Sequence, residues 1–160
     1  MLGLLYIEKV FQILHGDLIV RSKQLILITG DLIALLLFVF IGQLQHGLVD
    51  PDNPILRVLS TGWIYALLWL GSGWILGAFP TDENGFTRQN LIDRSLNAWL
   101  ITVLLGSVIR AFLLNSTVIF RSFLLASIGF GLLFLWVWRI PFWLWQRKKA
   151  HAIEAQLKVG

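Results

Sequence analysis

Four long apolar segments constrain this chain more than any other feature of its sequence. A helix needs about 20 mostly apolar residues to cross the hydrocarbon core of a bilayer. Four segments meet this requirement, at about residues 25–44, 58–79, 96–114 and 118–138. Stretches that contain proline, glycine or an Asn-Ser-Thr turn separate them. The sequence therefore predicts an all-α polytopic membrane protein whose four transmembrane helices form an antiparallel bundle.

The composition agrees with a membrane protein and offers little support for an enzyme. Hydrophobic residues make up 57% of the chain and charged residues only 14%, whereas a soluble domain carries about 25% charged residues. The absence of cysteine excludes disulfides, thiolate metal sites and a cysteine nucleophile. The sequence also lacks a P-loop, a zinc-protease motif and a nucleophile elbow. We therefore expect no enzymatic activity and no nucleic-acid partner.

The two ends of the chain differ from the apolar centre at residues 23–140. In residues 1–22, apolar side chains recur at helical spacing between polar ones, which predicts an amphipathic helix on the membrane surface. Residues 141–160 form a basic tail and predict a second surface helix. Ten of the thirteen Lys and Arg residues fall on the side of the two termini. By the positive-inside rule, both termini face the cytoplasm or stroma, which fits a bacterial inner membrane or a thylakoid.

Charged residues inside the spans predict where the bundle interior is polar. Each costs roughly 2.5–3.5 kcal/mol on insertion scales and therefore faces a partner or water. At the usual helical rise, Asp31 lies ~9 Å and Arg110 ~21 Å from the cytoplasmic edge, which argues against their pairing. Antiparallel threading instead brings Asp31 toward Arg139, at the cytoplasmic edge. It places Arg110 near three polar residues at the opposite end, namely Gln43, Gln45 and His46.

These polar residues admit more than one role. The Asp31–Arg139 pair is either a structural bridge, with Arg139 reaching the interface, or part of a proton or ion pathway. His46 is a solvated loop residue, a proton acceptor, or an axial ligand to haem or chlorophyll. Apart from that last reading we expect no cofactor and no metal.

Small residues recur every four positions and predict faces where helices pack closely. The residues concerned are Gly42 on the first span, Gly73 and Gly77 on the second, Ala98, Thr102 and Gly106 on the third, and Ser127 and Gly131 on the fourth.

Several short motifs occur in order along the chain, one or more in each span. They are "GD" at 30–31, "GQLQHG" at 42–47, "FP" at 79–80, "GSVIR" at 106–110 and "WR" at 138–139. Over about residues 27–140 the chain resembles domain-of-unknown-function family 3054, small four-span membrane proteins of bacteria and plastids. The resemblance implies a four-span protein without an established activity. It directs attention to Asp31, Gly42, His46, Gly106, Arg110 and Arg139.

These observations favour a non-enzymatic structural, assembly or accessory subunit of a membrane complex. Its partners would be the lipid bilayer and other membrane proteins or copies of itself. One alternative is a small proton or ion transporter or channel that uses Asp31, Arg110 and Arg139. A second is a pigment- or haem-binding membrane protein with His46 as the ligand.

Overall fold

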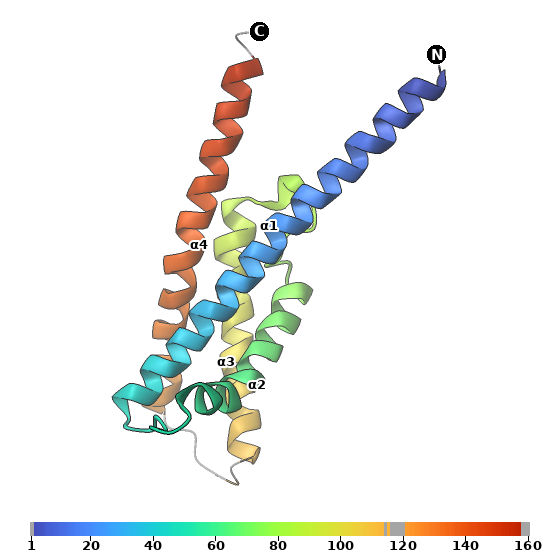
Figure 1. Cartoon of the computed structure of the whole chain (residues 1–160). Helices are drawn as coiled ribbons and strands as arrows, with labels where there is room; N and C mark the ends of the chain where they lie inside the picture. The colour runs from blue at the N-terminus through green and yellow to red at the C-terminus, as the bar shows by residue number, and fades with distance from the viewer. Residues whose placement is uncertain (1, 114, 116–120, 158–160) are drawn as a thin grey trace.

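A computed structural model of the chain describes residues 2–113, 115 and 121–157 and places most of them in four long helices (Figure 1). They are α1 (Leu2–Gln45), α2 (Pro54–Ile75), α3 (Arg94–Leu113) and α4 (Arg121–Leu157). A short 3-10 turn, η1 (Glu83–Gly85), and a π-helical turn, η2 (Gln89–Asp93), connect α2 to α3. Each long helix contains a stretch long and apolar enough to cross a membrane. The chain is thus an all-helical membrane protein, as its sequence predicts.

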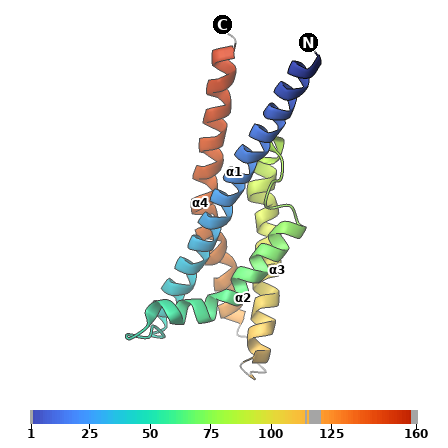
Figure 2. The same cartoon turned by 45° about the vertical axis from the view of Figure 1, so that its right-hand side comes forward.

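Each long helix packs against two others. Helices α1 and α3 both contact α2 and α4, and consecutive helices run in opposite directions (Figures 1 and 2). The first described residues of α1 and the last of α4 lie at the same end of the bundle, which we call the terminal end. The opposite end, where residues 46–53 join α1 to α2, is the loop end.

The outer helices α1 and α4 are longer than the predicted spans. The sequence divides the chain after residues 22 and 140, whereas α1 runs without interruption for 44 residues and α4 for 37 residues. Even Pro141 lies inside α4. The change from a mixed to an apolar surface at residue 22 alters what surrounds the helix, and it does not interrupt backbone hydrogen bonding. The sequence boundaries at residues 22 and 140 are therefore not helix ends.

Helix α2 ends four residues before the predicted limit at Phe79. Gly77 adopts a left-handed conformation, with φ of +69°, and Ala78 N–H donates to the Gly73 carbonyl at 2.7 Å. This is the hydrogen-bond pattern of a Schellman cap, which ends a helix at a glycine. Gly77 therefore ends α2, and it also lies against α3 as predicted, because a Cβ there would meet the Arg94 side chain. Phe79 then folds back onto Gly73, where a Cβ would lie 2.5 Å from its ring.

The other predicted limits also shift. Helical structure before α3 begins at Gln89, in η2, and not at residue 96. The described part of α4 begins at Arg121, and the predicted start of the fourth span at residue 118 lies outside the described residues. Most of the predicted Asn-Ser-Thr turn lies outside the described residues.

Small residues on α3 and α4 are buried as predicted. Aromatic side chains, and not helix backbones, pack against the two glycines among them. The buried set comprises Ala98, Thr102, Gly106, Ser127 and Gly131. The Trp99 indole occupies the space where Gly131 would carry a Cβ, and a Cβ at Gly106 would lie 2.5 Å from the Tyr65 ring. Gly42 differs from these glycines, since no described atom lies within 4 Å of its Cβ position. The prediction that Gly42 is a packing contact is wrong, because this part of α1 faces a cavity.

Hydrogen bonds made by polar side chains connect α3 to both of its neighbours. Ser72 on α2 and Thr102 on α3 share a hydrogen bond of 2.9 Å. The Trp99 indole N–H donates to the Ile128 carbonyl on α4 at 3.2 Å. Such bonds stabilise helix pairs in lipid, where neither group has water as an alternative partner.

The contact of Gly131 with Trp99 gives a direct test of this packing. We expect Gly131→Ala to lower the free energy of unfolding by about 1–3 kcal/mol, the usual cost of overpacking a core. Gly129 is the matched control, since it is exposed on the same helix with no described atom within 4 Å of its Cβ position. Gly129→Ala should be neutral, or stabilising by about 0.5–1 kcal/mol. Denaturant titration in detergent micelles measures both variants, and equal losses would contradict the packing shown by Trp99.

Candidate functional site

A buried ion pair joins α1 to α4 beside the segment that connects α2 to α3. The Arg139 Nε donates to Asp31 Oδ1 at 2.9 Å, and Nη2 donates to Oδ2 at 2.6 Å. Neither side chain has exposed surface. The two parallel bonds form the bidentate geometry in which guanidinium and carboxylate groups match best. The pairing predicted from antiparallel threading is therefore confirmed.

Arg139 also binds the backbone of the segment between α2 and α3. Its Nη1 donates to the Ala78 carbonyl at 3.1 Å and to the Leu91 carbonyl at 2.8 Å. Its guanidinium carbon lies 5.2 Å from the Trp69 ring centroid and 5.5 Å from that of Phe79, within the range of cation–π attraction. Arg139 therefore does not reach out to the interface, and the expectation that it does is corrected by its complete burial. One side chain fixes four segments to one another.

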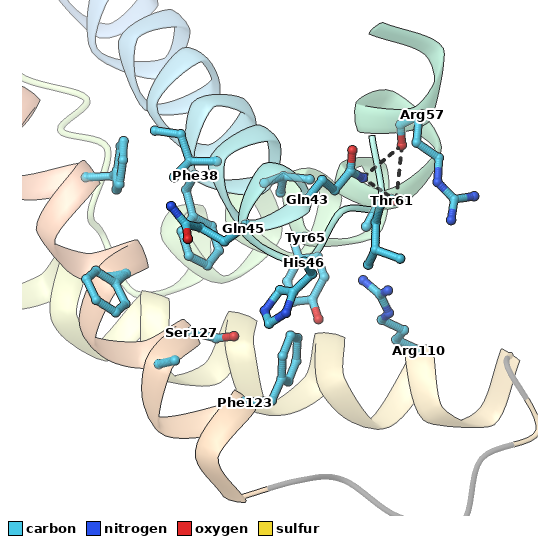
Figure 3. A pocket seen from close by; sticks show the side chains of 17 residues that line it. Phe38, Gln43, Gln45, His46, Arg57, Thr61, Tyr65, Arg110, Phe123 and Ser127 are labelled. Carbon is cyan, nitrogen blue, oxygen red and sulfur yellow. Dashed lines mark hydrogen bonds between the residues drawn. The ribbon is translucent and has the colours of Figure 1, made fainter. Parts of the chain in front are cut away.

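A cavity of about 360 Å³ lies at the loop end (Figure 3). All four long helices and the loop after α1 contribute to it. Its polar lining residues are Gln43, Gln45, His46, Arg57, Thr61, Tyr65, Arg110 and Ser127. Its larger apolar lining residues are Phe38, Val39, Ile41, Leu48, Phe123, Phe130 and Phe134. Arg110 thus shares one cavity with Gln43, Gln45 and His46, as depth along the spans predicts.

Hydrogen bonds hold one wall of this cavity in place. The Gln43 Nε2 donates to the Thr61 hydroxyl at 3.0 Å and to the Arg57 carbonyl at 3.2 Å. These bonds attach the end of α1 to the first turns of α2 (Figure 3). Arg110 reaches across from α3 toward Thr61, whereas the Arg57 guanidinium points away from His46 (Figure 3). The cavity wall is therefore preformed, with Arg110 inside it.

The Tyr65 hydroxyl, unlike the Gln43 amide nitrogen, lacks a hydrogen-bond partner in the described part of the chain. Tyr65 is only 6% exposed, and its hydroxyl has no hydrogen-bond partner among the described residues. In Figure 3 this hydroxyl points into the cavity on the side of Phe123. Buried hydroxyls are normally paired with protein or water, so this one offers a hydrogen bond to whatever enters the cavity.

Three aromatic rings separate the ion pair from the cavity. The ring centroids of Trp69 and Trp99 lie 6.0 Å apart, as do those of Trp99 and Phe38. Trp69 contacts Arg139, and Phe38 lines the cavity. We call Trp69, Trp99 and Phe38 the aromatic layer. The two polar regions at the ends of the bundle are therefore separate, and neither Asp31 nor Arg139 lines the cavity.

Sequence reasoning missed part of the cavity. Arg57, Thr61 and Tyr65 recur every four positions, so one face of α2 could have been assigned to the same polar region as Arg110. The contributions of Phe123, Phe130 and Phe134 carry no such signal. Among the described residues no group of three or more His, Asp or Glu side chains is placed to hold a metal ion. The role of His46 as an axial ligand stays a prediction.

Comparison with known families adds one match. The family model described as "Protein of unknown function (DUF3054)" matches residues 28–142. This range includes Asp31, Arg139, the aromatic layer and the lining of the cavity. No curated protein and no solved structure matches the chain.

The ion pair and the cavity should respond differently to loss of charge. We expect Asp31→Leu to lower the free energy of unfolding by about 3–5 kcal/mol, because Arg139 would stay buried without its counter-ion. Arg110→Leu should cost much less, since Arg110 is only partly buried at the cavity. Combining Asp31→Leu with Arg139→Met should recover part of the loss by removing both charges. Unfolding in detergent measures the three variants, and greater damage from Arg110→Leu would show that Arg110 is the buried anchor.

Proposed function

Since the chain belongs to the family of proteins of unknown function DUF3054, we propose from its own geometry that it is a non-enzymatic accessory subunit of a membrane protein complex. The observation that carries this proposal is the extension of α1 and α4 past the rest of the bundle at the terminal end (Figures 1 and 2). About 20 residues cross the hydrocarbon core, whereas α1 has 44 and α4 has 37. The surplus forms two helical arms that are available to a partner, namely the α1 arm (residues 2–22) and the α4 arm (residues 141–157).

The α4 arm carries features of a membrane interface. Arg147, Lys148 and Lys149 are exposed, and the Lys149 ammonium lies 4.0 Å from the Trp145 ring centroid. Tryptophan beside basic residues is typical of the boundary between lipid and water. Together with the basic residues near the start of α1, this favours a cytoplasmic or stromal terminal end. It also favours a partner surface, protein or lipid, that carries negative charge.

The ion pair supports a structural role. Both Asp31 oxygens are hydrogen-bonded, and Arg139 donates to two carbonyls besides. A carboxylate whose two oxygens are both bound by a buried guanidinium is poorly suited to accept or release protons during turnover. The aromatic layer beside it argues against a proton or ion pathway between Asp31 and Arg110. Pigment or haem binding through His46 has no specific observation in its favour.

The partner test uses the basic residues of the α4 arm. Arg147, Lys148 and Lys149 are replaced together by glutamine, and the charge-conserving variant Arg147→Lys/Lys148→Arg/Lys149→Arg is the matched control. We expect the protein purified from its native membrane in mild detergent to carry reproducible membrane-protein partners. Quantitative mass spectrometry should show their recovery falling several-fold in the glutamine variant and unchanged in the control. A wild-type protein that purifies as a monomer without partners would refute the proposal.

Orientation can be tested cleanly because the chain contains no cysteine. Lys148→Cys and Asp52→Cys place single exposed thiols at the terminal end and in the loop after α1. With a membrane-impermeant maleimide, we expect Asp52→Cys to be labelled in intact cells. Lys148→Cys should be labelled only after permeabilisation. The opposite pattern would place the termini outside the cytoplasm.

A further inference from the structure

We propose that the loop-end cavity binds a single-tailed amphiphile with an acidic head group, either phosphate or carboxylate. This inference stands apart from the accessory role, because it rests on the opposite end of the bundle. Three independent properties of the cavity carry it, namely its charge, its unsatisfied hydroxyl and its aromatic wall.

The charge of the cavity selects an anion. Arg110 points into the cavity, whereas the Arg57 guanidinium is directed away from it (Figure 3). None of the described lining residues is acidic. The nearby carboxylate of Asp50 is engaged within its own loop, where Oδ1 accepts from the Asp52 N–H at 3.0 Å. A cationic group beside a low-dielectric interior attracts an anion more strongly than it does in water. Guanidinium matches carboxylate and phosphate oxygens in particular.

The Tyr65 hydroxyl supplies a second polar contact from a fixed position. Its ring lies against Gly106, where a Cβ would approach to 2.5 Å, so α3 limits where the ring can lie. The hydroxyl is buried, unpartnered among the described residues and directed into the cavity (Figure 3). An acidic head group held by Arg110 would bring oxygen atoms that can accept this hydrogen bond. Because buried hydroxyls are normally hydrogen-bonded, this one is available to a ligand in the cavity.

The apolar wall selects a tail. Four phenylalanines line the cavity, namely Phe38, Phe123, Phe130 and Phe134. Phe123 and Phe130 are 40% and 61% exposed, so the wall continues onto the lipid-facing surface of α4. A tail can therefore enter sideways from the bilayer. The volume of about 360 Å³ lies at the lower end of the range for small-molecule sites, which favours one tail over two.

Thermal unfolding of the full chain in an uncharged detergent tests the ligand class. The probes are lysophosphatidic acid, a fatty acid, the matching uncharged monoacylglycerol, and glycerol 3-phosphate as the head group without a tail. We expect the two acidic amphiphiles to raise the Tm by several degrees and the other two probes to leave it unchanged. An equal shift with monoacylglycerol would show that the site recognises only the apolar tail. An equal shift with glycerol 3-phosphate would show that it recognises only the anion. Either result, or no shift with any probe, overturns the proposal.

Three variants locate the bound head group. Arg110→Gln should raise the Kd for lysophosphatidic acid about tenfold or more, the usual effect of losing a charged hydrogen bond. Tyr65→Phe should raise it about 2- to 10-fold without lowering the Tm of the ligand-free protein, because no hydrogen bond is lost there. Arg88→Gln is the matched control for charge, since Arg88 is exposed beside η2 at the terminal end. Its Kd should equal that of the wild type.

These variants also keep the proposal falsifiable. An unchanged Kd in Arg110→Gln, or an equal loss in Arg88→Gln, would mean that the ligand binds elsewhere. If Arg110→Gln does not fold, Tyr65→Phe decides alone, and a wild-type Kd in that variant overturns the proposal. None of these results bears on whether the arms recruit a partner.

Discussion

Asp31 and Arg139 carry opposite charges inside a bundle that is surrounded by lipid, and no water is available to hydrate them there. Removing such ions from water costs several kcal/mol each, and this is offset only when geometry and further hydrogen bonds are good. Here the carboxylate is bound at both oxygens, and the guanidinium donates to two backbone carbonyls as well. Those carbonyls belong to Ala78 and Leu91, on the segment between α2 and α3. The hydrogen bonds that Arg139 needs therefore fix the positions of α1, α4 and the segment between α2 and α3 relative to one another.

The interior beyond this ion pair is organised by aromatic rings that occupy the space beside glycines. Trp99 fits against Gly131, and Tyr65 fits against Gly106. Trp99 also takes part in the aromatic layer, which separates the ion pair from the cavity. The two ends consequently differ in kind. The region around the ion pair is closed and its charges are matched, whereas the loop end is open, cationic and holds the unpartnered Tyr65 hydroxyl. In an otherwise consistent fold, function is expected where polar groups lack their hydrogen-bond or charge partners.

The family match divides the molecule in a similar way. Residues 28–142 contain the ion pair, the aromatic layer and the cavity. The α1 arm and most of the α4 arm lie outside this range. The cavity is thus a candidate property of the matched core, and partner docking through the arms is a candidate property of this chain. Each proposal can fail without affecting the other, because they rest on opposite ends of the bundle.

The sequence by itself determined the four spans, the common side of the termini, the Asp31–Arg139 pair and the grouping of Arg110 with Gln43 and His46. The spans follow from the length of each apolar segment. The pairings follow from how deep each residue lies along its helix, which depends only on its position in the sequence. The early end of α2 was also readable in part, since Gly77 is a natural helix stop. Tertiary structure alone decided that Arg139 binds the Ala78 and Leu91 carbonyls and that Phe123 and Phe130 complete a cavity around Tyr65. Such contacts depend on how each helix is rotated about its axis and on which distant side chains then meet, and no local pattern encodes that rotation.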